Sequence, residues 1–199
     1  MRFDLQIIAS LVEENSRVLD MGCGRGDLLE YLQAAKNVKG FGIEIDEREV
    51  IECVEKGLSV IQGDLNEETA GYADQTFDYV ILSQTLQQVF DSEKVIKEML
   101  RVGKRGIVSF PCFSHVAIKW QFLLTSKAPM TRELPYPWYD TPNIRVITLK
   151  DFRQFCREQG IRILKEIAIS SHHRDESGKI VKFLPDWLAK YGIFLITKE

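Results

Sequence analysis

Short apolar runs alternate with segments of helical periodicity over the first 110 residues of this 199-residue chain. The runs are continuous in apolar residues, as strands are when helices cover both faces of a sheet. Strands are predicted at residues 17–21, 38–44, 58–62, 77–83 and 105–110. Helices are predicted to begin at Asp27 and to span 47–56 and 93–102. This alternation predicts β-α-β units, and therefore an α/β fold with a mostly parallel sheet.

Capping signals accompany three of the predicted helices. Asp27 is followed three residues later by Glu30, and Thr148 by Asp151, in the manner of a capping box. Ser92 stands directly before the helix at 93–102, where its hydroxyl can accept a hydrogen bond from a free backbone amide. We therefore predict side-chain caps at Asp27, Ser92 and Thr148.

Beyond residue 110 the pattern is less regular. Helices are predicted at 114–125 and 148–159, and strands at 161–169 and 192–197. Residues 128–143 are rich in proline and aromatic side chains, which predicts an ordered segment that is neither helix nor strand. The polar residues 170–179, which include His172 and His173, predict a solvated surface loop.

No stretch of the chain has the composition of a linker, so we predict a single domain over residues 1–199. Residues 1–110 form its predicted cofactor-binding half. Residues 111–147 form an inserted cover segment, and residues 148–199 contribute the final helix and strands.

Composition narrows the classes of partner. Lys and Arg number 26 against 29 Asp and Glu, so the chain lacks the positive field that binds a nucleic-acid backbone. No apolar run approaches the ~20 residues of a membrane span, and the N-terminus lacks a signal-peptide pattern. The cysteines are scattered without a C-x-x-C pair, which argues against a zinc site. We expect a reduced, cytoplasmic protein with no nucleic-acid, membrane or metal partner.

Residues 18–26, V-L-D-M-G-C-G-R-G, carry the clearest chemical signal. A strand runs into a glycine-rich turn that opens a helix, so backbone atoms can approach a ligand closely. The dinucleotide fingerprint G-x-G-x-x-G requires a glycine at position 27. Asp27 stands there and places a negative charge where a pyrophosphate would bind, which disfavours NAD. Asp20, just before the glycines, suits a cationic ligand group.

Two further acids follow the next predicted strands. Glu44 ends the second strand, where a carboxylate can accept both hydroxyls of a ribose. Asp64 follows the third strand and can accept from an adenine amino group, while Leu65 packs against the ring. Taken singly, each acid has an ordinary structural explanation: Asp20 could be a helix cap, Glu44 a solvated side chain, and Asp64 part of a turn. Their order at successive strand ends predicts a site for S-adenosylmethionine (SAM).

These motifs, V-L-D-M-G-C-G-R-G, F-G-I-E and Q-G-D-L, resemble those of the class I SAM-dependent methyltransferases. The resemblance implies a Rossmann-like sheet of seven strands, mostly parallel with the last strand antiparallel, and helices on both faces. It assigns the glycines and Asp20 to the methionine part of SAM or S-adenosylhomocysteine, and Ser83 to a place beside the sulfonium. The predicted cofactor-binding residues are Asp20, Gly22, Cys23, Gly24, Glu44, Ile45, Asp64, Leu65 and Ser83.

A narrower resemblance covers nearly the whole chain. The strings L-S-Q-T-L-Q at 82–87, E-M-L-R-V-G at 98–103, V-S-F-P at 108–111 and L-P-Y-P-W-Y-D-T-P-N-I at 134–144 resemble the methionine biosynthesis protein MetW family. Arg25 and Cys112 depart from that pattern, in which an acid and an asparagine are common. The resemblance implies a protein that works with homoserine O-acyltransferase.

Two functions therefore remain open. SAM is the downstream product of methionine synthesis, so a SAM-binding partner of the acyltransferase could report the level of the end product. The alternative is an active SAM-dependent methyltransferase that acts on an unidentified small molecule. An NAD-linked oxidoreductase, a third hypothesis, is disfavoured by Asp27.

The sequence identifies no catalytic base. Methyl transfer needs alignment more than acid or base chemistry. Residues that could instead line an acceptor pocket or a partner surface are Gln84, Gln87, His115, Tyr136, Trp138 and Tyr139. The two glutamines are neutral, and His115 is equally suited to capping a helix. The three aromatic residues are stiffened by neighbouring prolines and could simply close the core.

Overall fold

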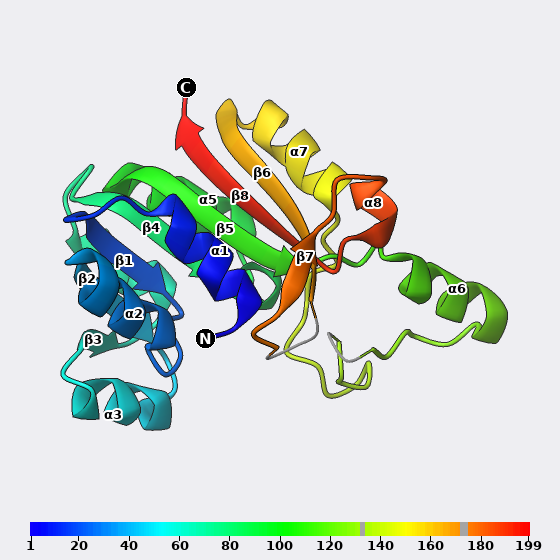
Figure 1. The fold of residues 1–199 in the computed structure, drawn as a ribbon, viewed down its shortest axis with the longest axis horizontal. Coiled ribbons are helices and arrows are strands. Elements are labelled where there is room, and N and C mark those ends of the chain that lie inside the picture. The colour runs from blue at the N-terminus through cyan, green and yellow to red at the C-terminus, as the bar shows by residue number, and fades with distance from the viewer. Residues whose placement is uncertain (132–133, 172–174) are drawn as a thin grey trace.

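Over residues 1–131, 134–171 and 175–199, which the computed structural model describes, the chain forms one eight-stranded sheet (Figure 1). The strands are β1 (Arg17–Met21), β2 (Lys39–Glu44), β3 (Ser59–Gln62), β4 (Phe77–Ser83), β5 (Gly103–Pro111), β6 (Ile161–Ser171), β7 (Gly178–Ile180) and β8 (Tyr191–Lys198). Their order is β3-β2-β1-β4-β5-β8-β6-β7. The pairs among β1 to β5 are parallel, whereas β8 runs antiparallel to both β5 and β6.

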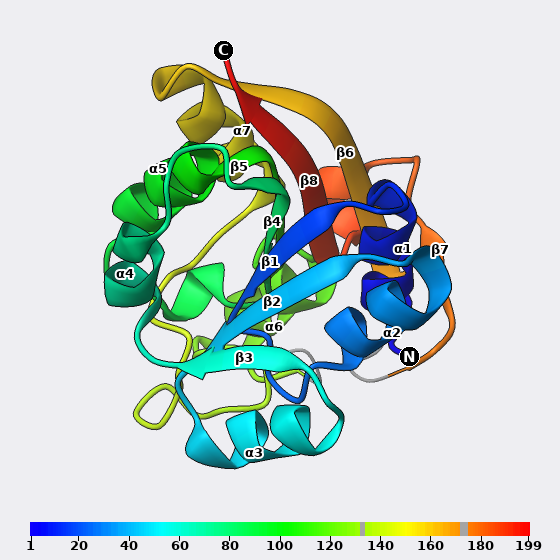
Figure 2. The ribbon, with the colours of Figure 1, turned by 90° about the vertical axis from the view of Figure 1, so that its left-hand side faces the viewer.

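Helices cover both faces of this sheet. They are α1 (Phe3–Leu11), α2 (Asp27–Lys36), α3 (Glu47–Glu55), α4 (Leu65–Glu68), α5 (Ser92–Val102), α6 (Val116–Thr125), α7 (Leu149–Glu158) and α8 (Pro185–Leu188), with 3₁₀ turns at Thr69–Gly71 and Leu86–Gln88. Figure 2 shows α1 and α2 on one side of the sheet and α4, α5 and α7 on the other. The predicted α/β fold with a mostly parallel sheet is therefore confirmed.

Each face of the sheet carries its own apolar cluster. Ile8 of α1 and Leu29 of α2 are buried with Ile193 of β8 on one face. Phe194, the next residue of β8, points to the opposite face, where it packs against Phe152 of α7. Side chains of a strand alternate between faces, so one continuous apolar run supplies both clusters.

The predicted number of seven strands is wrong, because the described residues form eight. The additional strand, β7, lies within and just beyond residues 170–179, which the polar composition predicted as a loop. Gly178–Ile180 pairs antiparallel with the end of β6 at the edge of the sheet. All three of its residues are exposed, so no apolar signal marks it. His172 and His173 lie outside the described residues.

The helix starts agree only partly with the predicted caps. Asp27 is the first residue of α2 rather than its cap, and Gly26, with φ +74°, occupies the cap position. The cap of α5 is Asp91, not Ser92; its carboxylate accepts from the backbone amide of Lys94 at 3.0 Å. Thr148 caps α7, as predicted, through the amide of Asp151.

The cover segment, residues 111–147, extends away from the sheet. Its helix α6 projects to one side of the molecule in Figure 1. The large apolar side chains Trp120, Phe122, Leu123 and Leu124 on this helix are all more than half exposed. Residues 128–131 and 134–143 contain neither helix nor strand, as the proline content predicted.

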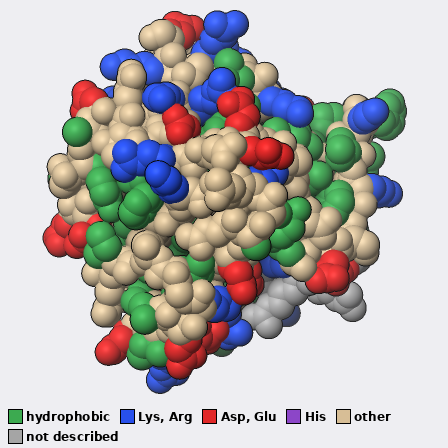
Figure 3. All heavy atoms as spheres, turned by 60° about the vertical axis from the view of Figure 1, so that its left-hand side comes forward, with side chains coloured by type: hydrophobic (Ala, Val, Ile, Leu, Met, Phe, Trp, Pro, Cys, Tyr) green, Lys and Arg blue, Asp and Glu red, His purple; other side chains and the backbone are tan. Residues whose placement is uncertain are grey.

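The molecular surface shows no broad region of one charge on the face drawn in Figure 3, where acidic and basic side chains are interspersed. No helix within the described ranges is long and apolar enough to cross a membrane. The same ranges contain no group of three or more His, Cys, Asp or Glu side chains placed to bind a metal ion.

Candidate functional site

The glycine-rich turn after β1 folds over the carboxyl ends of β1 and β2. Gly22, Gly24 and Gly26 all have positive φ angles, +77°, +55° and +74°, which L side chains rarely adopt. The amide of Gly22 donates to the carbonyl of Ile43 at 2.8 Å. The amide of Gly24 donates to the Glu44 carboxylate at 2.8 Å. These bonds fix the turn against β2 and leave its outer side open to a cleft.

Asp20 lies at the base of that cleft. Its side chain is buried, lines a cavity of about 470 Å³, and receives no hydrogen bond at Oδ1 from any described residue. Burial, and next the negative charge of Glu44, raise the pKa of Asp20 to about 8, while the positive charge of Arg2 acts in the opposite direction. A buried acceptor without a partner is costly, so this oxygen suits a donor supplied by a ligand.

Glu44 is buried at the end of β2, where its carboxylate organises the local backbone. It accepts hydrogen bonds from the amides of Gly24 and Ile45, both at 2.8 Å, and of Asp46 at 3.0 Å. A carboxylate has about four acceptor positions, so one remains for a ligand hydroxyl. Glu44 lines a second cavity of about 540 Å³, together with the exposed side chain of Ile45.

Asp64 and Leu65 line this second cavity as well. Asp64 is exposed and caps the short helix α4: its Oδ1 accepts from the backbone and side-chain amides of Asn66 at 2.7 and 2.9 Å. The turn that sequence reasoning gave as the alternative is therefore present. Both hydrogen bonds from Asn66 go to Oδ1 of Asp64. Leu65, the next residue, is half-buried.

The two cavities are adjoining halves of one cleft. Arg2, Gly22, Gly24, Glu49 and Ser83 line both of them. Ser83, at the end of β4, is held by the hydroxyl of Ser109 at 3.1 Å. The structure brings all nine predicted cofactor residues to this cleft. Asp20, whose Oδ1 has no donor among the described residues, lines one half, and the carboxylates of Glu44 and Asp64 line the other, an arrangement that fits a nucleoside bearing an amino-acid group.

Two residues that line both halves were not predicted as site residues. Arg2 lies directly before α1. Glu49 lies on α3 and is partly buried, which raises its pKa, with the charges of Glu44 and Asp46 acting in the same direction. Neither residue stands directly after a strand, so a search for polar residues at the carboxyl ends of strands does not identify them.

Gln84 and Gln87 belong to a hydrogen-bonded chain beside the cleft. Gln84 lines the cleft, and its Nε2 donates to Asp4 Oδ2 at 2.6 Å. Gln87 is buried and does not line the cleft; its Nε2 donates to the carbonyl of Gln84 at 2.6 Å. The carbonyl of Gln87 accepts from the amides of Ile144 and Arg145, in the cover segment, at 2.9 and 3.1 Å.

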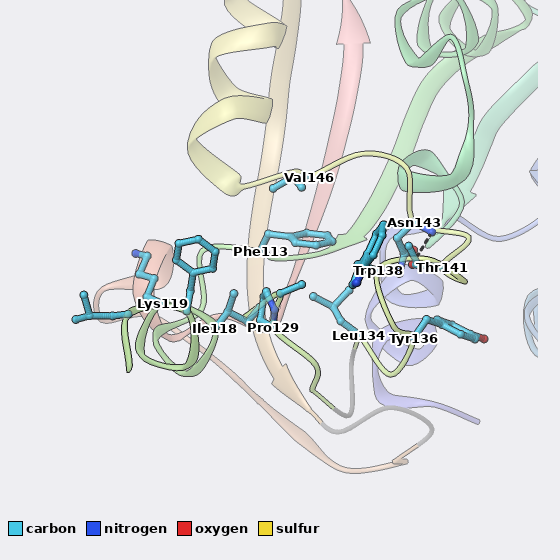
Figure 4. A pocket seen from close by; sticks show the side chains of 13 residues that line it. Phe113, Ile118, Lys119, Pro129, Leu134, Tyr136, Trp138, Thr141, Asn143 and Val146 are labelled. Carbon is cyan, nitrogen blue, oxygen red and sulfur yellow. Dashed lines mark hydrogen bonds between the residues drawn. The ribbon is translucent and has the colours of Figure 1, made fainter. Parts of the chain in front are cut away.

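The remaining candidates lie elsewhere. His115 caps α6 by accepting from the amide of Ala117 at 3.2 Å, and it lines a small separate cavity of about 150 Å³. Tyr136 and Trp138 line an apolar cavity of about 750 Å³ in the cover segment (Figure 4). Tyr139 is exposed and packs edge-on against Trp138. The structure does not bring these four side chains to the cofactor cleft.

Comparison with solved structures supports the fold. The chain is 20% identical, with a TM-score of 0.73, to a SAM-dependent methyltransferase from Thermotoga maritima described as a possible histamine N-methyltransferase; the alignment covers 99% of this chain and 88% of that one. It is 16% identical, with a TM-score of 0.72, to a SAM-dependent methyltransferase from Archaeoglobus fulgidus, over 98% and 91% of the two chains. At these identities the likeness concerns the fold alone.

Comparison of sequences is more specific. The chain is 32% identical over 173 residues to the bifunctional methionine biosynthesis protein MetXA/MetW of Rhodopirellula baltica, which covers 82% of this chain and 28% of that protein. It is 35% identical over 104 residues to a demethylmenaquinone methyltransferase of Bacillus mycoides, over 48% and 43% of the two chains. The chain thus spans less than half the length of these relatives. The family model for the methionine biosynthesis protein MetW matches residues 2–196, and the chain belongs to that family.

Proposed function

We propose that this chain binds SAM and acts in methionine biosynthesis together with homoserine O-acyltransferase. The observation that carries the SAM assignment is that Asp20 lines the cleft while its buried Oδ1 has no donor among the described residues. The partner assignment is supported by the relative in which MetXA and MetW are parts of one bifunctional protein.

Each part of SAM has residues of suitable chemistry in the cleft. Asp20 accepts from the α-ammonium group, and Glu44 accepts from one ribose hydroxyl with the single carboxylate position that its backbone bonds leave. Asp64 and Leu65 flank the adenine. Ser83, which lines both halves of the cleft, stands between the amino-acid end and the nucleoside end. Bound SAM supplies an electrophilic methyl group on its sulfonium.

The location of the cleft supports a reporting role. SAM is formed downstream of methionine, so its occupancy of this site tracks the end product of the pathway in which the acyltransferase works. The cleft is connected to the cover segment through the bonded pair Gln84 and Gln87. Occupancy of the cleft can thereby change the surface that a partner meets.

The second candidate function is methyl transfer to a small molecule. It is favoured by the likeness of about half the chain to demethylmenaquinone methyltransferase. Two features of the cleft count against methyl transfer. Within the described residues, the lining of the cleft includes no histidine. The large apolar cavity lined by Tyr136 and Trp138 shares no lining residue with the cleft.

Thermal melting tests the cofactor assignment. SAM at 100 times its dissociation constant stabilises the folded chain by ~2.7 kcal/mol, which raises the Tm by roughly 5–11 °C for a chain of this size. NAD serves as the matched control and is expected to leave the Tm unchanged. A shift with NAD and none with SAM contradicts the proposal.

Copurification tests the partner assignment. The chain is expressed with the homoserine O-acyltransferase of its own cell, and acyl transfer is assayed with and without the chain and over a series of SAM concentrations. We expect a stable complex and an acyl-transfer rate that depends on SAM only when the chain is present. Absence of a complex, together with an unchanged rate, removes the partnership and leaves methyl transfer as the function to pursue.

A further inference from the structure

Arg2 holds a fixed position at the mouth of the cofactor cleft. Its guanidinium donates to the Asp4 carboxylate through Nε at 3.0 Å and through Nη2 at 2.7 Å. The Asp4 side chain is only 7% exposed and also accepts from Gln84 at 2.6 Å, so it is itself held in place. Arg2 therefore reaches the cleft from a braced position rather than as a mobile surface side chain.

The guanidinium retains unused donors. An arginine has five N–H donors in a planar fork, and Asp4 engages those of Nε and Nη2. No described residue accepts a hydrogen bond from Nη1. The Arg2 side chain is 30% exposed and lines both halves of the cleft. Its charge also lies close enough to Asp20 to oppose the rise in the pKa of that carboxyl group.

Arg25 is the other cation that lines the cleft within the described residues. Its side chain is 63% exposed, and its Nε pairs with Glu52 of α3 at 3.5 Å. Arg25 is not among the charges that shift the pKa of Asp20, whereas Arg2 is. Of the two arginines, only Arg2 is both braced by a buried carboxylate and close to Asp20.

We propose that Arg2 binds the α-carboxylate of the methionine part of SAM, so that Arg2 and Asp20 together form a site for a zwitterionic amino-acid group. Asp20 receives the ammonium and Arg2 donates to the carboxylate, the pairing in which arginine gives its strongest hydrogen bonds. This inference rests on the proposed SAM binding. It adds Arg2 as the residue that binds the α-carboxylate of SAM.

Calorimetric binding of two ligands tests this role. S-adenosylhomocysteine carries the amino-acid group, whereas 5′-methylthioadenosine keeps the adenosine and the thioether but lacks it. For Arg2→Met we expect the affinity for S-adenosylhomocysteine to fall on the order of 10–100-fold, because a charge-assisted contact is lost. The affinity for 5′-methylthioadenosine is expected to stay unchanged.

Further variants separate the outcomes. Arg2→Lys keeps the charge but loses the fork, so it is expected to recover part of the lost affinity; if Arg2→Met fails to fold, the same two ligands are compared on Arg2→Lys. Equal losses for both ligands, or no loss for either, overturn the inference. Loss of the selective contact in Arg25→Met instead of Arg2→Met also overturns it.

The same experiment distinguishes a failure of the proposed SAM binding from a failure of the role proposed for Arg2. If the unmodified chain binds neither S-adenosylhomocysteine nor 5′-methylthioadenosine, the SAM assignment itself fails. If it binds both with equal affinity, the cleft takes the nucleoside but does not recognise the amino-acid group, and the roles of Asp20 and Arg2 both fail. If the unmodified chain prefers S-adenosylhomocysteine and Arg2→Met keeps that preference, only the role of Arg2 fails.

Discussion

The carboxyl group of Asp20 is predominantly protonated near neutral pH in the ligand-free chain, because burial and the charge of Glu44 raise its pKa to about 8. An ammonium group favours the ionised carboxylate, so binding of SAM lowers this pKa and releases a proton. The affinity for SAM is therefore expected to increase as the pH rises from about 5.5 to 7. Calorimetry in buffers of different ionisation enthalpy measures the released proton, and Asp20→Asn removes both effects. Identical heats in all buffers would contradict this assignment of the proton.

Glu44 serves the fold as well as the ligand. Its carboxylate satisfies the amides of Gly24, Ile45 and Asp46. Glu44→Ala is expected to lower the free energy of unfolding by ~1–3 kcal/mol without any ligand, because these donors lose their acceptor. It is also expected to weaken SAM by a similar ~1.5–3 kcal/mol. Urea unfolding and calorimetry measure the two losses separately, and an unchanged urea midpoint shows that water replaces the carboxylate at no cost.

At the scale of the element, Gly26 explains why the turn carries a third glycine. A Cβ at this position would lie 2.3 Å from Leu58 Cδ1 and 2.9 Å from Cys53 Sγ, so the start of α2 packs directly against the end of α3 and the residue before β3. Close packing and a left-handed backbone therefore account for the glycine at 26, and contact with a pyrophosphate is not needed to explain it.

Gly57 provides a matched control for this explanation. Its φ of +73° is nearly that of Gly26, but a Cβ there meets nothing within 4 Å. Gly57→Ala is expected to cost about 1 kcal/mol for the backbone alone, and Gly26→Ala a further ~1–3 kcal/mol for overpacking. Urea unfolding of both variants measures the difference. Equal losses would show that backbone conformation, rather than packing, requires glycine at 26.

The strands of the parallel half were predictable within a residue or two, because strands buried on both faces read as continuous apolar runs. β7 and α1 were not. The residues of β7 are exposed, and the sequence of α1, F-D-L-Q-I-I-A-S-L, is apolar on too many sides to show a clear helical period. The predicted cap of α2 was wrong for a different reason: Gly26 occupies the cap position and offers no side-chain acceptor.

That the predicted site residues meet in one cleft could be foreseen from the sequence, because the carboxyl ends of parallel strands lie at one edge of the sheet. Asp20, Glu44 and Ser83 each end or nearly end a strand. Arg2, directly before α1, and Glu49, on α3, reach the same cleft. Their place depends on how α1 and α3 pack on the sheet, which no local pattern in the sequence specifies.

At the scale of the whole molecule, hydrogen bonds link the cofactor cleft to the cover segment. Arg2 bonds to Asp4, Asp4 to Gln84, Gln84 to Gln87, and the carbonyl of Gln87 accepts from the amide of Ile144. A ligand that binds to Arg2 is therefore expected to make every bond in this series open less often. We propose this series of hydrogen bonds as the route by which bound SAM affects the cover segment.

Hydrogen exchange measures that connection. On addition of SAM, the amides of Ile144 and Arg145 are expected to exchange more slowly, because both donate to Gln87. Gln87→Ala removes the side-chain bond to Gln84, and it is expected to abolish this protection while the glycine-rich turn stays protected. Slower exchange confined to the turn in the unmodified chain would show that the cover segment does not sense the ligand.

The two edges of the sheet bear on how any partner can attach. β3 has four residues and β7 has three, and these are the outermost strands. Edge strands this short leave few backbone N–H and C=O groups open to a strand from another chain, a device that natural sheets use against aggregation. Neither edge therefore favours binding of a partner by strand addition. We expect a partner to contact side chains on helices and loops instead.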